Sequence, residues 1–549
     1  MRIRLATIAA LLAVVPPAGT TIEQTTEGTR PAARLVAQFD GLGVGFEGPQ
    51  GKYEGRNPSD NSLAVGPDHI VQTVNTRLAI FTKKGRRFAD TGRALYGPVE
   101  TNVVFAGLGG PCASRNNGDA VVRYDQLANR WLVTMPIFSR IPLTDVGERP
   151  PIGTPAPPGQ LAAPGQASSP GAAAALPANP PIPPAPAQGR GQRAQGAPPP
   201  PPPPGTYAMC YAISTGPDPM GPYYRYAFER PLFPDYPRPA VWIDGYYVPT
   251  SSSDNRISET IATQKHACVV DRARMLKGEP ASEQCQVVLN VNFLNNADID
   301  GTSPPPAGAP NVMIAAGGTQ LDKILEADTI DTWQFHVDWN TPANTRLVGP
   351  VKIAVAPYQY LCGGQLTNCV PQPGTDRGLD AQGDKIMSRV VYRRIGNREA
   401  IVALHSVNTA AGGGGVRWYE LLVDKARTLS LAQQGTYAPG GLYRWMASPA
   451  IDRFGNIGIG YSFGGTPHFA GQRFAGREKR DPPGVLSMKE TVLAEGAASQ
   501  TTTLRWEDYT TTAIDPSDDC TVWYGGDYLA KDATAYSSRI GAFRMPGCR

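Results

Sequence analysis

The stretch RWEDYTTTAIDPSDDCTVWYGGDYL, residues 505–529, joins two short apolar runs through a turn rich in aspartate. The runs TTAI and TVWYGG are rich in the β-branched and aromatic residues that strands favour, and the turn between them carries Asp, Pro and Ser. This pattern predicts a β-hairpin. The same hairpin is the unit to search for elsewhere in the chain.

An apolar strand, a tight turn and a second apolar strand recur along the whole sequence. Early strand residues of seven such copies are Leu63, Val121, Ala240, Val312, Val390, Ala450 and Ala513. Further strand-like runs follow each copy, so each repeat has room for about four strands. Seven four-stranded repeats predict an all-β protein, a seven-bladed β-propeller, because radial repetition leaves few exposed sheet edges.

The blade count and the closure of the ring rest on weaker patterns. The copy at Val312 is weak, so six or eight blades stay open as alternatives. The last repeat, which ends with SRIGAFRMPGC at 538–548, lacks an outer strand, and the alternating run ARLVAQFDG at 33–41 has the pattern to supply it. We expect this N-terminal strand to complete the last blade. Two separate β-sandwiches are the structural alternative.

Three segments lie outside the repeats. Residues 1–20 carry two arginines, a short apolar run and then small residues, as a secretory signal peptide does, and residues 21–32 are expected to link it to a propeller at 33–549. Residues 141–204 are rich in Pro, Ala and Gly, which predicts a disordered insertion within blade two. The alternating runs on either side of this insertion predict one hairpin with a greatly lengthened loop.

Composition limits the class of protein. The 549 residues include 51 basic and 47 acidic side chains, a balance that argues against nucleic-acid binding. No run after the signal peptide is long and apolar enough for a membrane helix. We expect a secreted or periplasmic protein, without a membrane span, that is a monomer.

The eight cysteines are an even number in a chain expected to reach an oxidising compartment, which predicts disulfides. None lies in a CxxC pair and there are only five histidines, so a zinc site is not expected. Spacing alone does not fix connectivity. The pairing that proximity along the chain favours is Cys268 with Cys285, Cys362 with Cys369, Cys520 with Cys548, and the remaining Cys112 with Cys210.

Polar and aromatic residues recur just before the predicted inner strands. In a propeller the loops that lead into these strands share one face, so the residues should converge there. They are Asp60, Asp119, Asp235, Tyr236, Asp384, Tyr443, Arg444, Trp445, Arg505 and Trp506. Aromatic rings stack on sugar faces while charged groups bind their oxygen atoms. This face is therefore predicted to bind a polar ligand, a glycan or a cell-surface polymer.

The same residues also have structural interpretations. An aspartate before a strand often caps a turn, and a tryptophan or tyrosine there commonly packs between blades. Catalysis would need a paired acid and base or nucleophile, for which Glu507, Asp508 and Tyr509 are the candidates. The leading hypothesis is a non-enzymatic binding or scaffold protein. The alternative is a sialidase-like, glycoside-cleaving enzyme that uses carboxylates at the mouth of the channel.

No motif in the sequence requires a cofactor, since a GxSxG elbow, an HExxH pair and a Walker loop are all missing. A calcium-stabilised propeller is a third option. Asp515, Asp518 and Asp519 offer three carboxylates within five positions, and calcium prefers such oxygen ligands. The stronger expectation is that Asp515 and Asp518 form the hairpin turn.

Several motifs resemble a known group of proteins. GVRWYEL at 415–421, GNIGIGYS at 455–462 and the stretch at 505–529 resemble exported bacterial β-propeller proteins of uncharacterised function. The resemblance implies a propeller over about residues 55–548 apart from the insertion, and it implies no particular activity. AIDRFGNIGIGYS at 450–462 is also loosely similar to the Asp-box turn of sialidases. It departs from that turn in lacking the Ser-x-Asp-x-Gly spacing and the following Thr-Trp.

Overall fold

Runs rich in valine, isoleucine and aromatic residues form strands throughout the chain, and the helices α1 (Gly110–Ser114) and α2 (Arg272–Met275) are short. This computed structural model describes residues 22–142, 153, 155–159, 161, 205–250, 264–318, 327–364 and 366–548. The predicted all-β class is confirmed. No helix in these ranges has the length and hydropathy needed to cross a membrane.

Seven successive units of four antiparallel strands make up most of the described chain. The first unit contains β5 (Ser62–Val65), β6 (His69–Val74), β7 (Arg77–Thr82) and β8 (Ala94–Glu100). The second contains β9 (Val121–Asp125), β10 (Arg130–Pro142), β12 (Gly205–Ser214) and β13 (Tyr223–Arg230). The third contains β14 (Ala240–Val241), β15 (Tyr246–Tyr247), β16 (Gln264–Val270) and β17 (Glu283–Leu289).

The remaining four units repeat this order. The fourth contains β18 (Asn295–Ile299), β19 (Asn311–Ala316), β20 (Thr329–His336) and β21 (Arg346–Ala354). The fifth contains β24 (Val390–Ile395), β25 (Arg398–Asn408), β26 (Gly414–Val423) and β27 (Leu429–Tyr437). The sixth contains β28 (Tyr443–Ile451), β29 (Ile457–Gly465), β30 (His468–Arg477) and β31 (Thr491–Ala494). The seventh contains β32 (Thr511–Ile514), β33 (Val522–Tyr528), β34 (Ser537–Arg544) and β2 (Arg34–Asp40).

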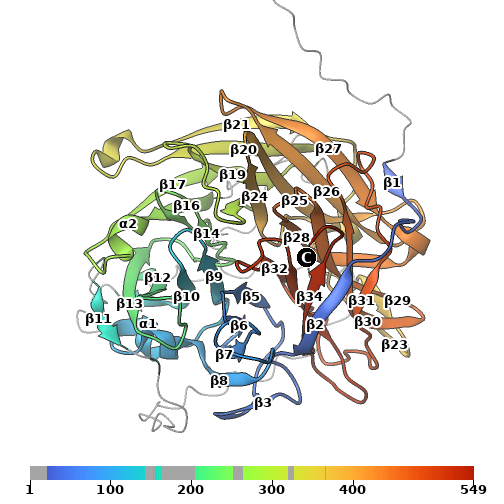
Figure 1. Cartoon of the computed structure of the whole chain (residues 1–549), viewed down its shortest axis with the longest axis horizontal. Helices are drawn as coiled ribbons and strands as arrows, with labels where there is room; N and C mark the ends of the chain where they lie inside the picture. Colours follow the sequence, from blue (N-terminus) through green and yellow to red (C-terminus); the bar gives the residue numbers. More distant parts are fainter. Residues whose placement is uncertain are drawn as a thin grey trace, which may run out of the picture.

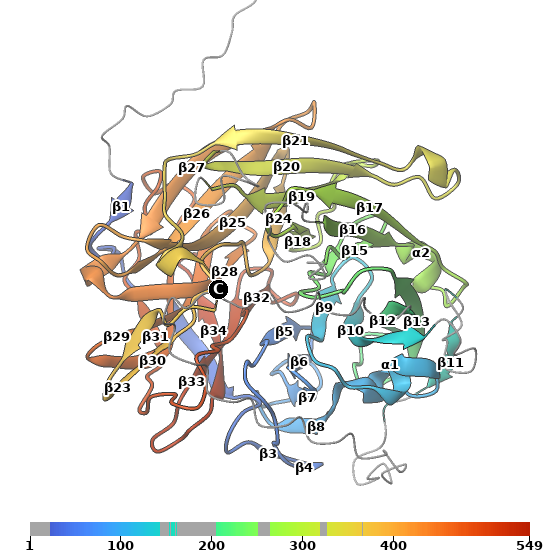
Figure 2. The ribbon, with the colours of Figure 1, turned by 180° about the vertical axis from the view of Figure 1, so that it is seen from behind.

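The units follow one another around a common centre, and the colours in Figures 1 and 2 run once round the molecule from blue to red. The first strand of each unit, from β5 to β32, contacts the first strand of the next, and β32 contacts β5. β18 also pairs in parallel with β24, which joins the fourth and fifth units into one larger sheet. The first strands thus form an inner ring.

Strands from distant parts of the chain complete the outer edges. β2 pairs antiparallel with β34, with Asp40 opposite Arg539, which is the pairing predicted for residues 33–41. β1 (Glu23–Gln24) lies in the segment expected to be a linker, where it pairs in parallel with β27. The other short elements are β3 (Glu47–Gly48), β4 (Gly51–Lys52), β22 (Val370–Gln372), β23 (Thr375–Leu379), η1 (Thr101–Phe105), η3 (Pro342–Asn344), η4 (Leu361–Gly363) and η5 (Pro439–Gly441).

The predicted anchor of the fourth repeat, Val312, is not on an inner strand. It lies on β19, and the inner strand of that unit is β18, whose sequence is NNADI. These polar residues are buried because their side chains bond to the backbone: Asn295 Nδ2 donates to the carbonyl oxygens of Ile386 (3.1 Å) and Ser388 (2.7 Å). A search for apolar alternation therefore misses this strand.

The two runs that flank residues 141–204 pair with each other. β10 and β12 are antiparallel neighbours, with Leu132 opposite Ile213 and Ile137 opposite Ala208, as the sequence predicts. Two described parts of the insertion are strand, namely the end of β10 and β11 (Ala156–Gly159), which pairs with β13. The rest of the predicted insertion, and the predicted signal peptide, lie outside the described residues.

All four predicted disulfides are confirmed. The bonds are Cys112–Cys210, Cys268–Cys285, Cys362–Cys369 and Cys520–Cys548. The first joins α1, which lies between the first and second units, to β12 of the second unit, and the second joins residues that face each other on β16 and β17. The fourth joins the last hairpin to the end of the described chain.

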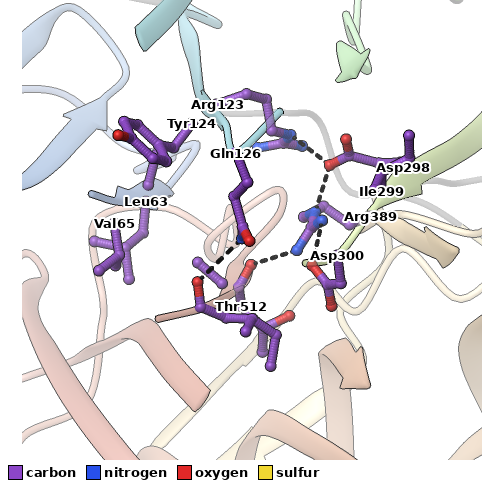
Figure 3. Close-up of a pocket in the computed structure, with 13 residues that line it drawn as sticks. Leu63, Val65, Arg123, Tyr124, Gln126, Asp298, Ile299, Asp300, Arg389 and Thr512 are labelled. Carbon is purple, nitrogen blue, oxygen red and sulfur yellow. Dashed lines mark hydrogen bonds and ion pairs between the residues drawn. The ribbon is translucent and has the colours of Figure 1, made fainter. Parts of the chain in front are cut away.

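A buried ion-pair network crosses the inner ring (Figure 3). Arg389 Nε lies 2.7 Å from Asp298 Oδ2, and Arg389 Nη2 lies 2.9 Å from Asp300 Oδ1. Arg123 Nε lies 3.2 Å from the same oxygen of Asp298. All four side chains are buried. The network therefore links the second, fourth and fifth units at the centre of the molecule.

Backbone groups of three further units join this network. Asp298 Oδ1 accepts a hydrogen bond from the amide of Val241 (2.8 Å), and Asp300 Oδ2 accepts one from the amide of Ile451 (3.3 Å). Arg389 Nη1 donates to the carbonyl oxygen of Thr512 (3.0 Å). Because most of its hydrogen-bonding atoms are satisfied, the ion pairs and hydrogen bonds of the network offset much of the desolvation cost of holding charge in the interior.

We expect Arg389→Met to lower the free energy of unfolding by about 3–5 kcal/mol, because Asp300 loses its ion-pair partner while it stays buried. The matched control is Arg87→Met, since the Arg87–Asp218 pair is exposed and should contribute less than about 1 kcal/mol. Urea unfolding of both variants measures the difference. Equal losses in the two would contradict a central role for the network.

We expect the fold to tolerate replacement of residues 165–200 by a short Gly-Ser linker. β10 and β12 pair directly, and loop-closure entropy changes by only about 0.6 kcal/mol for each halving of loop length. The urea midpoint should therefore change little relative to the full chain. A variant that loses its cooperative unfolding transition would show that the deleted residues belong to the folded core.

Candidate functional site

Residues before the inner strands of several units meet at one end of the ring, here called the mouth. The hydroxyl of Tyr236, before β14, donates to Asp508 Oδ1, before β32 (3.0 Å). Asp119, before β9, is hydrogen-bonded to the side chains of Asp60, before β5, and Asp235. The loops of four units therefore bring the predicted residues together.

The backbone at the mouth is strained in a recurrent way. Asp60 (φ 49°), Asp119 (φ 53°), Tyr236 (φ 50°), Gln382 (φ 44°) and Asp508 (φ 79°) are non-glycine residues in the left-handed region, and each belongs to a different unit. Each costs about 1–3 kcal/mol, which the surrounding structure must offset. Such strain gathers at functional sites, because it holds side chains in positions that a relaxed loop would not give.

Three carboxyl groups form a hydrogen-bonded chain at the mouth. Asp119 lies between Asp60 and Asp235, and two carboxyls can share a hydrogen bond only when one is protonated. Asp60 Oδ2 accepts from Asn75 Nδ2 (2.7 Å), and no donor among the described residues reaches its Oδ1 apart from this chain. The chain therefore needs shared protons.

The surroundings keep those protons in place. Burial, and then the negative charges of Asp119 and Asp508, raise the pKa of Asp60 and of Asp235 well above the usual range. Burial and Asp508 also raise the pKa of Asp119, although the hydrogen bonds from Asp60 and Asp235 work in the opposite direction. Asp119 is thus the acceptor of the chain and its two neighbours are the donors.

Asp508 has ionic partners instead. Arg505 Nη2 donates to Asp508 Oδ2, and the Tyr236 hydroxyl donates to Oδ1. Burial lowers the pKa of Arg505, but Asp508 beside it and the other acidic groups nearby together raise this pKa above its usual value, so the arginine stays charged. Arg505 is partly exposed, with about a third of its side chain accessible, while Asp508 is buried. A ligand at the mouth can therefore reach the guanidinium group and Tyr236.

Several buried polar groups at the mouth have no hydrogen-bond partner among the described residues. The Tyr509 hydroxyl is one: the residue is 3% exposed and lies near Asp119 and Asp60, which raise its pKa after burial does. Gln382 Nε2 is another, while Gln382 Oε1 accepts from Lys385 Nζ (3.0 Å). Buried donors left without partners cost free energy, so both positions favour a ligand or water.

Not all predicted residues face this cluster. Glu507 Oε2 accepts from Ser462 Oγ (2.9 Å) and its Oε1 accepts from Gln472 Nε2 (2.9 Å) and the Asp527 amide (2.8 Å). Burial and Asp527 raise the pKa of Glu507 well above its usual range. Trp506 Nε1 donates to the same Ser462 oxygen. Glu507 and Trp506 therefore belong to the packing between the sixth and seventh units.

Other predicted residues lie beside the mouth or away from it. Trp445 is fully buried, with its ring 6.3 Å from that of Trp506. Arg444 forms an ion pair with Glu490 (2.6 Å), in a cleft that Thr25 and Phe463 also line. Tyr443 lies on the same strand, β28, with its hydroxyl 3.5 Å from the Gly412 carbonyl oxygen. Asp384 accepts from Asn292 Nδ2 (2.9 Å) and lies 3.4 Å from Lys385 Nζ.

Sequence reasoning missed three residues of the mouth, namely Arg238, Gln382 and Lys385. The Arg238 guanidinium lies over the Tyr509 ring (4.3 Å) and its Nε donates to the Met387 carbonyl oxygen (2.7 Å). Each is within two residues of a predicted one, so a wider window before each strand would have included them.

The aspartates of the last hairpin turn have separate partners. Lys83 Nζ lies 2.8 Å from Asp515 Oδ1, Arg544 Nη2 lies 3.3 Å from Asp518 Oδ2, and Asp519 pairs with Arg393. Asp518 also accepts from the amides of Cys520 and Thr521, as a turn-forming aspartate does. Calcium binding here stays a prediction, and the ion would have to displace three cationic side chains.

No family model matches the chain, and no curated protein matches it. Similar solved structures include a protein of unknown function from Dyadobacter fermentans, with 8% identity and a TM-score of 0.33, over 94% of this chain and 100% of that one. A polysaccharide lyase of family PL25, an ulvan lyase, has 11% identity and a TM-score of 0.34, over 92% and 95%. A thermostable family-43 glycoside hydrolase has 8% identity and a TM-score of 0.26, over 58% and 91%. Such low scores do not establish a shared fold or activity.

The shared protons of the mouth predict a pH-dependent stability. Asp60 keeps its proton in the folded protein after the unfolded chain has lost it, so stability should fall as pH rises above about 4. Asp60→Asn keeps the amide acceptor for Asn75 and a donor for Asp119, but it does not titrate. Between pH 4 and pH 7.5 we expect the melting temperature of this variant to fall by less than that of the wild type.

Calorimetric melting at the two pH values measures this difference. The matched control is Asp338→Asn, an exposed carboxylate whose pKa is lowered by a hydrogen bond from the Thr341 amide, so its removal should not reproduce the effect. If the melting temperatures of Asp60→Asn and the wild type fall by the same amount between the two pH values, Asp60 is not a protonated group at neutral pH.

Proposed function

We propose that the protein is an exported, seven-bladed β-propeller that binds a glycan or another polar surface polymer at the mouth. The seven four-stranded units, the inner ring of first strands and the pairing of β2 with β34 support this architecture. Joining the N-terminal strand to the last sheet is a common way to avoid an open edge in a ring of sheets.

Export is supported by the four disulfides. Disulfides persist in oxidising compartments and are rare in the cytosol, and they join every cysteine of this chain. The layout of residues 1–20 points the same way. The protein therefore acts outside the cytoplasm, where glycans and other surface polymers are available to it.

One observation carries the binding function: the mouth gathers strained residues from five units around polar groups that lack partners. Tyr509 and Gln382 each leave a buried group unsatisfied, while Tyr236 and Arg505 are accessible. An aromatic ring beside a guanidinium group and carboxyls matches the hydroxyl-rich edge and apolar face of a sugar. A polymer would bind across the mouth and not enter the ring, because the ion pairs of Arg389 cross its centre.

Binding is favoured over cleavage by the arrangement of the carboxyls. Glycosidases hold two carboxyl groups about 5–9.5 Å apart, which leaves room for a sugar and a water molecule. Asp60, Asp119 and Asp235 are instead in direct hydrogen-bond contact. Glu507 is enclosed by Ser462, Gln472 and the Asp527 amide. Of the predicted catalytic candidates, Asp508 and Tyr509 are the ones that remain at the mouth.

Screening the purified protein against a glycan panel, for binding and for release of reducing ends, tests this proposal. We expect binding without turnover, and a loss of about tenfold in affinity in Asp508→Asn, because Arg505 and Tyr236 lose the carboxylate that positions them. Asp338→Asn is the control for an equivalent change away from the mouth. Turnover that disappears in Asp508→Asn would instead identify a glycan-cleaving enzyme.

A further inference from the structure

Carboxylates outnumber cations at the mouth. The carboxylates are Asp60, Asp119, Asp235, Asp380 and Asp508, with Asp384 beside them, and the cations are Arg238, Lys265, Lys385 and Arg505. Among these cations, Arg505 pairs with Asp508, Lys385 pairs with Asp384, and Arg238 donates to the Met387 carbonyl oxygen. The carboxyls of Asp60, Asp119 and Asp235 are hydrogen-bonded to one another instead, and those hydrogen bonds need shared protons.

The hydrogen-bonded chain of Asp60, Asp119 and Asp235 is accessible to solvent at its Asp235 end. Asp60 is 1% exposed and Asp119 is 8% exposed, while Asp235 is only half-buried. A group that arrives from solvent thus meets Asp235 first and Asp119 behind it. Asp60 Oδ1 and the Tyr509 hydroxyl lie deeper, and neither has another partner among the described residues. Both oxygen atoms can accept a hydrogen bond from an incoming donor.

The rings around the chain already accommodate cations. Arg238 lies over the rings of Tyr509 (4.3 Å), Phe293 (5.4 Å) and Tyr236 (5.5 Å), and Lys385 Nζ lies 5.3 Å from the Tyr236 ring. Aromatic faces attract cations most strongly where water is displaced. Tyr236 is partly exposed, so its ring can also contact a ligand cation.

We propose that the mouth prefers a glycan with free amino groups, whose ammonium binds between Asp235 and Asp119 and replaces a shared proton. This inference rests on the proposed glycan-binding function. An ammonium donates three hydrogen bonds, which suits a site that offers carboxylate and phenolic oxygens. An N-acetylated sugar lacks this charge, and a uronate brings negative charge towards Asp119 and Asp508.

Replacement of a proton by the ligand has a measurable consequence. The groups that face Asp235 and Asp119 are Asp60, Asp508, Arg238, Tyr236, Tyr509 and Lys265. Burial and the charges of Asp119 and Asp508 raise the pKa of Asp235 in the free protein, so an ammonium that ionises this carboxyl on binding should release a proton to the buffer. Titration calorimetry in two buffers with different ionisation enthalpies measures that proton.

The test compares hexamers of glucosamine, N-acetylglucosamine and galacturonate, with hexalysine as a non-sugar cation, at pH 6 and constant ionic strength. We expect glucosamine hexamer to bind at least about tenfold more tightly than the other two sugars, with proton release. Asp119→Asn and Asp235→Asn should each bind glucosamine hexamer about tenfold more weakly than the wild type does. Their affinity for N-acetylglucosamine hexamer should change little. Asp338→Asn is the matched control and should match the wild type.

Each contrary outcome identifies what fails. Equal affinity for the glucosamine and N-acetylglucosamine hexamers, without proton release, would overturn the amine preference and leave glycan binding in place. Hexalysine binding as tightly as glucosamine hexamer would overturn the assignment to a sugar. If no hexamer binds, the amine preference is overturned, and the glycan panel decides whether the proposed function stands. Asparagine tolerates the left-handed backbone of residue 119, so the variant should fold, and its melting curve checks this.

Discussion

Arg389 holds two buried carboxylates at the centre of the ring, and the position of the inner strands depends on this contact. Several inner strands are short, since β14 has two residues and β5 and β32 have four each. So few ladder hydrogen bonds cannot fix their relative positions. Asp298, Asp300 and Arg389 supply the missing cross-links, because they bond to the third, sixth and seventh units as well as to each other. A second contact, between Lys83 and Asp515, ties the first unit to the last.

The centre and the mouth hold buried charge in different ways. At the centre each carboxylate meets an arginine, and most of its remaining oxygen atoms meet backbone amides, so the network is nearly complete within the protein. At the mouth the chain of Asp60, Asp119 and Asp235 is completed only by protons, and the Tyr509 hydroxyl lies without a described partner. A polar network that is incomplete in the free protein costs stability, and a protein retains such a cost where a ligand removes it. This contrast separates the structural network from the binding site.

The sequence predicted the hairpin units, the β2 strand and the disulfides because each depends on local pattern or on proximity along the chain. β18 was not predicted because its sequence, NNADI, is mostly polar. Hydrogen bonds from its side chains to backbone groups, and not apolar character, allow these residues to be buried. The mouth was predicted as a position together with several of its members, among them Asp60, Asp119 and Tyr236, but Arg238, Gln382 and Lys385 were missed. Glu507 and Asp508 are adjacent in sequence, yet one bonds to Ser462 and the other to Tyr236. Their left-handed backbone sends the two side chains to different units, and no sequence pattern shows that conformation for a non-glycine residue.

The two ends of the ring also differ in their connections, and this difference favours the mouth as the functional end. At the opposite end, short turns join first to second strands in most units, as between Val65 and His69 or Ile395 and Arg398, although residues 300–310 form a longer connection in the fourth unit. At the mouth, second strands end and third strands begin. In the second, third and fourth units, the residues between these two strands include the long segments 143–204, 251–263 and 319–326. Long connections tolerate insertion, and binding residues gather on them when a rigid scaffold holds their ends. Evolution can therefore vary the surroundings of the mouth without moving the inner strands that position Asp119 and Asp508.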